Sequence, residues 1–183
     1  MSEELIVATC SPTMAGLKTG NMFNCPLKSK EELKENIRKL NKILVPRGVR
    51  ILPLKISKDK ALLYMYRPTL LRNDLNDTLA IKILSDMDYP IDNTDCCIVK
   101  LIDKLKAYED FPHEIGLFLG YPAEDVHGFI KNCAKCAKCV GTWKVYGDEE
   151  QAIKKFKAYK KCTKVYCECY RKNNSFDRLV VCK

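Results

Sequence analysis

Six residues in the last quarter of the chain recur at alternating spacings of four and three. They are Ala152, Phe156, Tyr159, Thr163, Tyr166 and Tyr170. This spacing places them on one face of an α-helix, and Asp148 is a suitable N-cap residue, so we predict one long helix that ends near Lys172. Because such a face has to be buried against other elements, the stripe favours helices packed on a sheet.

Two β-rich runs at residues 49–56 and 61–66 flank the polar segment Ser57-Lys58-Asp59-Lys60, which predicts a β-hairpin. We predict further short strands at residues 5–9, 143–146 and 179–182. Apolar spacing together with Ser, Pro and Gly boundaries predicts the other helices at residues 12–19, 30–44, 68–84, 95–108, 112–119 and 122–140, with Ser29 as a candidate N-cap of the helix at 30–44. The predicted fold class is α+β, a small, mostly antiparallel sheet with about six helices packed on it.

Positive charge and cysteine are concentrated in the last third of the chain. With 183 residues the chain has the usual size of one domain, so we predict a single domain over residues 1–183. Residues 1–130 are charge-neutral, whereas residues 131–183 carry 14 Lys and Arg against 5 Asp and Glu, and seven of the eleven cysteines. A basic region of this kind attracts an anionic small molecule or an acidic protein, unless it is only a solvated lysine face.

The sequence predicts a cytoplasmic location. No segment approaches the ~20 apolar residues that cross a bilayer, and the start MSEELIVATC lacks a basic segment followed by an apolar one. In the reducing cytosol, eleven cysteines indicate free thiols or metal ligands rather than disulfides.

The cysteine spacing Cys133-x-x-Cys136-x-x-Cys139 resembles the first three ligands of an iron–sulfur cluster. Cys162, Cys167 and Cys169 are candidates for the fourth ligand, with Cys162 chosen for the site, and zinc would accept four of these six thiolates. Two alternatives to a metal site stay open. If residues 122–140 form one helix, Cys133 and Cys136 are small buried residues of its apolar stripe. The other alternative is a redox-reactive pair of cysteines.

A second candidate site follows the strand predicted at residues 5–9. A helix that starts at Ser11-Pro12 would offer free backbone amides to an anion, and its dipole would lower the pKa of the Cys10 thiol. Cys10 is therefore a candidate nucleophile, unless the segment is a simple helix cap with a buried cysteine. The candidate ligand-binding residues are Ser11, Thr13, Lys18 and Arg67.

His113 and Glu114 are further catalytic candidates, at the start of a predicted helix where the dipole disfavours a charged imidazole. A Cys10–His113 dyad would make the chain a small enzyme, whereas a capping or packing role for His113 would not. Residues 115–129 also match helix-turn-helix spacing, with a small residue early in the first helix, a glycine in the turn and apolar residues in the second helix. Glu124 and Asp125 would face phosphates there, which argues against nucleic acid as a partner.

Four segments resemble the bacterial family called domain of unknown function 3793. They are CSPTMAGLKTGNMF (10–23), YMYRPTLLRNDL (64–75), FPHEIGLFLGYPAEDVHGFI (111–130), and GTWKVYGDEEQA (141–152) with KKCTKVYC (160–167) behind it. The matching segments keep their chain order and span nearly the whole sequence. The resemblance implies no activity, substrate or cofactor, so the function has to be argued from the residues.

Overall fold

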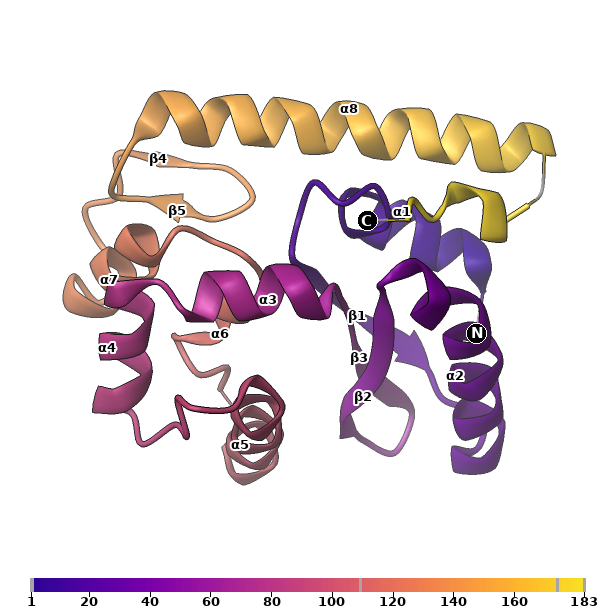
Figure 1. Cartoon of the computed structure of the whole chain (residues 1–183), viewed down its shortest axis with the longest axis horizontal. Helices are drawn as coiled ribbons and strands as arrows, with labels where there is room; N and C mark the ends of the chain where they lie inside the picture. Colours follow the sequence, from indigo (N-terminus) through magenta and orange to yellow (C-terminus); the bar gives the residue numbers. More distant parts are fainter. Residues whose placement is uncertain (1, 109, 174, 183) are drawn as a thin grey trace. The chain divides into compact units, whose positions relative to one another are not determined.

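The computed structural model describes residues 2–108, 110–173 and 175–182. The chain divides into two compact units, residues 1–69 with 159–183 and residues 70–158. The described part contains eight α-helices and a small antiparallel sheet, which confirms the predicted α+β class (Figure 1). That the chain forms a single domain stays a prediction. No described helix combines the length and apolarity that crossing a membrane requires.

The first unit is built on a three-stranded antiparallel sheet. Its strands β1 (Gly20–Pro26), β2 (Arg50–Ile56) and β3 (Lys60–Tyr66) have the order β1-β3-β2. The predicted hairpin is confirmed as β2 and β3, in which Arg50 pairs with Tyr66 and Ile56 with Ala61. Strand β3 is central and buried from Ala61 to Tyr66, as its unbroken apolar run requires.

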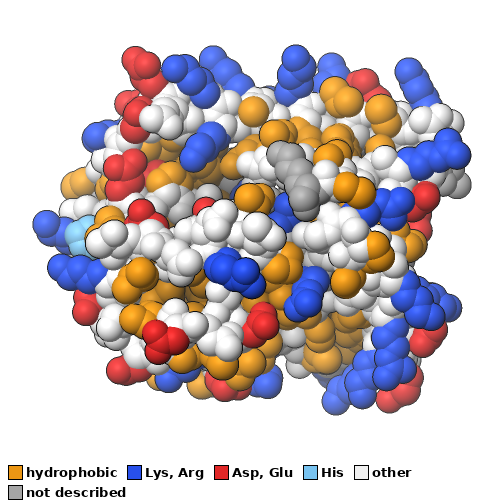
Figure 2. All heavy atoms as spheres, viewed as in Figure 1, with side chains coloured by type: hydrophobic (Ala, Val, Ile, Leu, Met, Phe, Trp, Pro, Cys, Tyr) orange, Lys and Arg blue, Asp and Glu red, His pale blue; other side chains and the backbone are white. Residues whose placement is uncertain are grey.

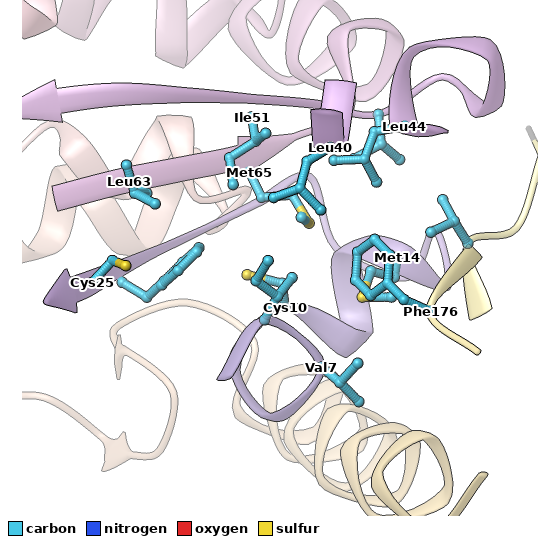
Figure 3. Packing of buried hydrophobic residues seen from close by; sticks show 14 of the residues in the cluster. Val7, Cys10, Met14, Cys25, Leu40, Leu44, Ile51, Leu63, Met65 and Phe176 are labelled. Carbon is cyan, nitrogen blue, oxygen red and sulfur yellow. The ribbon is translucent and has the colours of Figure 1, made fainter. Parts of the chain in front are cut away.

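Three helical elements surround this sheet: α1 (Glu3–Met14), α2 (Lys30–Leu44) and the short 3₁₀ helix η1 (Val45–Arg47). The Ser29 side chain caps α2 by accepting a hydrogen bond from the Glu32 amide, as predicted. Helix α1 packs against β1 and α2 against β2. Figure 3 shows their apolar side chains gathered with those of the sheet and with Phe176.

Three predictions for the first unit are wrong. Residues 5–9 are not a strand, because they lie within α1, whose buried residues Ile6, Val7, Cys10 and Met14 follow helical spacing. Gly20 does not follow a helix but begins strand β1, which the sequence did not reveal. Residues 179–182 are not a strand: η2 (Asp177–Leu179) is a 3₁₀ turn, and the Val181 amide then bonds to the Met14 carbonyl at 3.1 Å.

The second unit is mostly helical. It contains α4 (Thr78–Asp86), α5 (Thr94–Ala107), α6 (Ile115–Phe118) and α7 (Ala123–Lys131), and the two-residue strands β4 (Cys139–Val140) and β5 (Lys144–Val145). The helix predicted at 68–84 is interrupted, because Asp77 ends α3 (Pro68–Leu75) and caps α4 by accepting hydrogen bonds from the amides of Leu79 and Ala80.

The long helix α8 (Glu149–Asn173) confirms the first prediction. Asp148 caps it by accepting a hydrogen bond from the Gln151 amide at 3.0 Å. The six stripe residues are all buried or half-buried, while the neighbouring lysines are exposed. Figure 2 shows Lys and Arg side chains projecting along this helix. The periodicity of this segment therefore predicted its type, its start and its inner face.

Candidate functional site

One carboxylate organises the part of the second unit that contains the candidate site. Asp125, in the first turn of α7, is 2% exposed. Its Oδ2 accepts a hydrogen bond from Trp143 Nε1 at 2.7 Å, and its Oδ1 accepts from the amides of Tyr146 and Gly147 at 2.7 and 2.8 Å. Asp125 therefore ties the β4–β5 hairpin to α7 and fixes the indole ring.

A pocket of about 370 Å³ lies between this hairpin, α7 and the segment that begins at Phe111. Its walls are mostly apolar and include the rings of Tyr121, Phe129 and Trp143. The Tyr121 and Trp143 rings are stacked, with centroids 4.9 Å apart. Phe111 and Val140 also line the pocket and are 54% and 71% exposed, so its rim is apolar as well. Concave apolar sites of this size with few polar groups are typical of small-molecule binding.

Besides the Tyr121 phenol, three ionisable side chains line the pocket: His113, Asp125 and Lys144. His113 is exposed and meets the edge of the Phe129 ring, with centroids 5.2 Å apart and planes at 85°. The Lys144 ammonium lies 5.9 Å from the centre of the same ring and donates a hydrogen bond to the Ala134 carbonyl at 2.7 Å. Because the hydrogen bonds of Asp125 hold the hairpin, His113 and Lys144 are the groups that can meet a ligand.

The catalytic candidate Glu114 is buried beside His113 but is engaged elsewhere. Its Oε1 accepts hydrogen bonds from the Lys104 ammonium at 2.8 Å and from the Tyr89 hydroxyl at 2.9 Å. Burial, and then the charge of Glu114, raises the pKa of Tyr89. Through Lys104 this group joins α5 to Glu114 at the start of α6.

The predicted anion site at Cys10 rests on a helix start that is absent, because residues 3–14 are one helix. Cys10 is fully buried among apolar side chains (Figure 3), and burial raises the pKa of its thiol to about 12. Ser11 is buried too, and its hydroxyl donates to the Val7 carbonyl one turn earlier. A protonated, enclosed thiol is a poor nucleophile. Cys10 and His113 belong to different units.

The other predicted ligand-binding residues serve the C-terminal end of α1. Thr13 Oγ1 donates to Asn21 Oδ1 at 2.9 Å. Arg67 is 2% exposed and donates to the carbonyls of Thr13, Met14 and Val181 at 2.7, 2.6 and 2.8 Å. Lys18 is 4% exposed, and burial lowers the pKa of its amine to about 8. Within this unit the guanidinium acts as a structural cap for carbonyls that the helix leaves unpaired.

The predicted metal ligands are not gathered in one place. Helix α7 ends at Lys131, so Cys133 and Cys136 do not lie on a buried helical stripe but are exposed in a loop. Cys139 is half-buried in β4, where burial and the neighbouring Glu149 raise the pKa of its thiol. Cys162 is buried and belongs to the other unit. Among the described residues no three His, Cys, Asp or Glu side chains are placed to hold a metal ion. Metal binding by these cysteines stays a prediction.

The helix-turn-helix reading of residues 115–129 changes in two respects. Helix α6 is a single turn of four residues, and Asp125 is directed into the protein instead of toward a ligand. Sequence reasoning did not select Asp125 or Lys144 as members of a site. The signal that could have indicated a site here is that segment 131–147 contains four lysines, no acidic residue and the only tryptophan of the chain.

Changing Asp125 to asparagine is expected to lower the free energy of unfolding by about 1–2 kcal/mol, because an amide NH₂ would face the Trp143 N–H and leave a buried donor unpaired. The amide oxygen still accepts from Tyr146 and Gly147, so the hairpin is loosened but not released. Since Trp143 is the only tryptophan, its emission should shift to longer wavelength. The exposed neighbour Glu124 changed to glutamine is the control, and equal effects of the two changes would contradict the anchoring role.

Comparison with known proteins identifies a family but no characterised relative. The family model DUF3793, described as "Protein of unknown function (DUF3793)", matches residues 6–180. No curated protein and no solved structure matches the chain.

Proposed function

Because the chain belongs to this family, whose description carries no activity, we propose a function from the pocket itself: the protein binds a small molecule that combines a flat apolar body with an acidic group. The pocket beside Trp143 is the observation that carries the proposal. Its aromatic walls suit a ring system, and His113 and Lys144 also line it. The proposal places this activity in the cytoplasm.

The charge around the pocket supports an acidic ligand over a basic one. Segment 131–147 contains four lysines and no Asp or Glu. Asp125 is the one carboxylate among the described lining residues, and both of its oxygens accept hydrogen bonds from the hairpin. A ligand carboxylate, sulfonate or phosphate would therefore meet Lys144 and His113, while its apolar part displaces water from the pocket.

The test uses 8-anilinonaphthalene-1-sulfonate, a flat aromatic anion, and N-phenyl-1-naphthylamine, which has the same rings without the sulfonate. We expect one sulfonate dye to bind per chain, with energy transfer from Trp143 that quenches its emission. The neutral dye should bind more weakly. The near-ultraviolet circular dichroism of the protein should stay unchanged, which separates pocket binding from dye adsorption to a loosened core.

Lys144→Met is expected to weaken binding of the sulfonate dye roughly three- to tenfold, the effect of losing one partly buried ion pair, and to leave the neutral dye unaffected. Lys131→Met removes the same charge from an exposed site on α7 outside the pocket and serves as the matched control. The proposal fails if the two variants weaken binding equally, or if the dye binds without quenching Trp143.

A further inference from the structure

The loop between α7 and β4 has an unusual backbone. Cys133, Ala134 and Cys136 all have positive φ, at 48°, 63° and 59°. Residues with side chains rarely adopt this left-handed conformation, which costs of order 1 kcal/mol or more for each residue. Such strain persists only where surrounding contacts enforce it, and it is frequent at functional sites.

Four hydrogen bonds enforce this conformation. The Lys135 amide donates to the Asn132 carbonyl at 2.9 Å and closes a tight turn whose two central residues have positive φ. The Ala134 amide donates to the Phe129 carbonyl at 2.9 Å. The Lys144 ammonium donates to the Ala134 carbonyl at 2.7 Å, and the Lys138 amide donates to the Val145 carbonyl at 2.8 Å. The loop is therefore fixed to both α7 and the hairpin.

Two exposed thiols lie three residues apart in this loop. Cys133 and Cys136 are exposed, whereas Cys139 is half-buried. A fully extended chain would hold the Cα atoms of residues 133 and 136 about 10 Å apart, beyond the roughly 4.4–6.8 Å of a disulfide. The turn shortens this span. The other exposed cysteines among the described residues, Cys96 and Cys182, have no exposed cysteine three residues away.

From these observations we propose that Cys133 and Cys136 form a thiol–disulfide exchange site for small anionic disulfides. The thiolate of one cysteine attacks a sulfur of the disulfide RSSR, forming a mixed disulfide and releasing one RS⁻, which takes up a proton. The second thiolate then attacks the protein sulfur of the mixed disulfide and releases the second RSH. The protein dithiol is oxidised to the Cys133–Cys136 disulfide, and RSSR is reduced to two RSH.

The surroundings favour an anionic disulfide over a neutral one. Lys131, Lys135 and Lys138 flank the two thiols and are exposed, and segment 131–147 has no acidic residue. Positive charge raises the local concentration of an anionic co-reactant. This site does not depend on the ligand proposed for the pocket, and its test uses no dye.

The experiment equilibrates the reduced protein with mixtures of glutathione and glutathione disulfide, blocks free thiols with iodoacetamide and maps the peptides by mass. We expect a peptide that contains the Cys133–Cys136 disulfide, escapes alkylation and is about 2 Da lighter than the same peptide with two free thiols. Its proportion should rise with the ratio of glutathione disulfide to glutathione. The double variant Cys96→Ser/Cys182→Ser should behave in the same way. Cys136→Ser should stop at the mixed disulfide of Cys133 with glutathione.

The proposal is overturned if both loop cysteines of the wild-type protein remain alkylated at every glutathione ratio, or form only separate mixed disulfides. Because the substituted cysteines are exposed, we expect their serine variants to fold like the wild-type protein.

Discussion

Replacing Arg67 with methionine is expected to lower the free energy of unfolding by about 3–5 kcal/mol, as removal of one member of a buried polar network does. The guanidinium donates to four carbonyls, those of Thr13, Met14, Arg47 and Val181. Methionine fills much of the same volume but leaves all four without this donor. Urea unfolding followed by circular dichroism measures the loss.

Two matched variants qualify the Arg67 result. Lysine at position 67 keeps the charge but presents a single nitrogen, so it should recover only part of the stability. Arg50→Met changes an exposed arginine of β2 in the same unit and should cost less than about 0.5 kcal/mol. If Arg67→Met costs no more than Arg50→Met, the carbonyl-capping role is wrong.

Lys18→Met is expected to stabilise the protein at pH 7, by up to roughly 3 kcal/mol on the basis of 1.36 kcal/mol per pKa unit. Burial lowers the pKa of the Lys18 amine from 10.5 to about 8, so at pH 7 the folded protein holds a charged amine in an unfavourable place. Methionine removes the charge and keeps a long apolar side chain. Denaturant unfolding of both proteins at several pH values, under reducing conditions, measures the difference.

The pH dependence of the Lys18 effect has a definite sign. Between pH 8 and 10.5 the unfolded chain binds a proton that the folded chain has lost, so wild-type stability gains with rising pH in this window. The advantage of Lys18→Met should therefore be full below pH 8 and fade toward pH 10.5. Comparing variant with wild type cancels the other groups that titrate there. Lys28→Met, at an exposed position, should show no such trend, and a constant advantage for Lys18→Met would refute the explanation.

The elements that were predicted correctly are those with a local signal in the sequence. The apolar stripe of α8, the cap of α2 at Ser29 and the hairpin of β2 and β3 can each be recognised from residues that are close together in the chain. Helix α1 was misread because Ile6 and Val7 favour strands intrinsically. Its packing against the sheet outweighs that preference, and the helical spacing from Ile6 to Cys10 and Met14 was the better guide.

The candidate site was less predictable, because it depends on contacts between distant residues. Asp125 has the ordinary look of a carboxylate in the first turn of a helix, and only the fold brings Trp143 and Tyr146 to it. In the sequence, Cys133 and Cys136 fit the apolar stripe of a helix. The structure has a left-handed turn there instead, and the sequence gives no sign of it because the turn contains no glycine. The sequence placed Cys10 at the start of a helix, where a thiol is reactive, whereas in the structure it is fully buried.

The first unit is formed by chain segments that precede and follow the second unit in the sequence. This order affects folding during synthesis on the ribosome. Phe176 and Val180 complete the core that Cys10 and Met14 begin, and Arg67 bonds to Val181. Translation proceeds at about 5–20 residues per second, so residues 70–175 delay completion of that core on the order of 5–20 s. During this time α1 and the sheet carry uncovered apolar surface. We therefore expect the nascent chain to expose apolar surface that the finished protein covers.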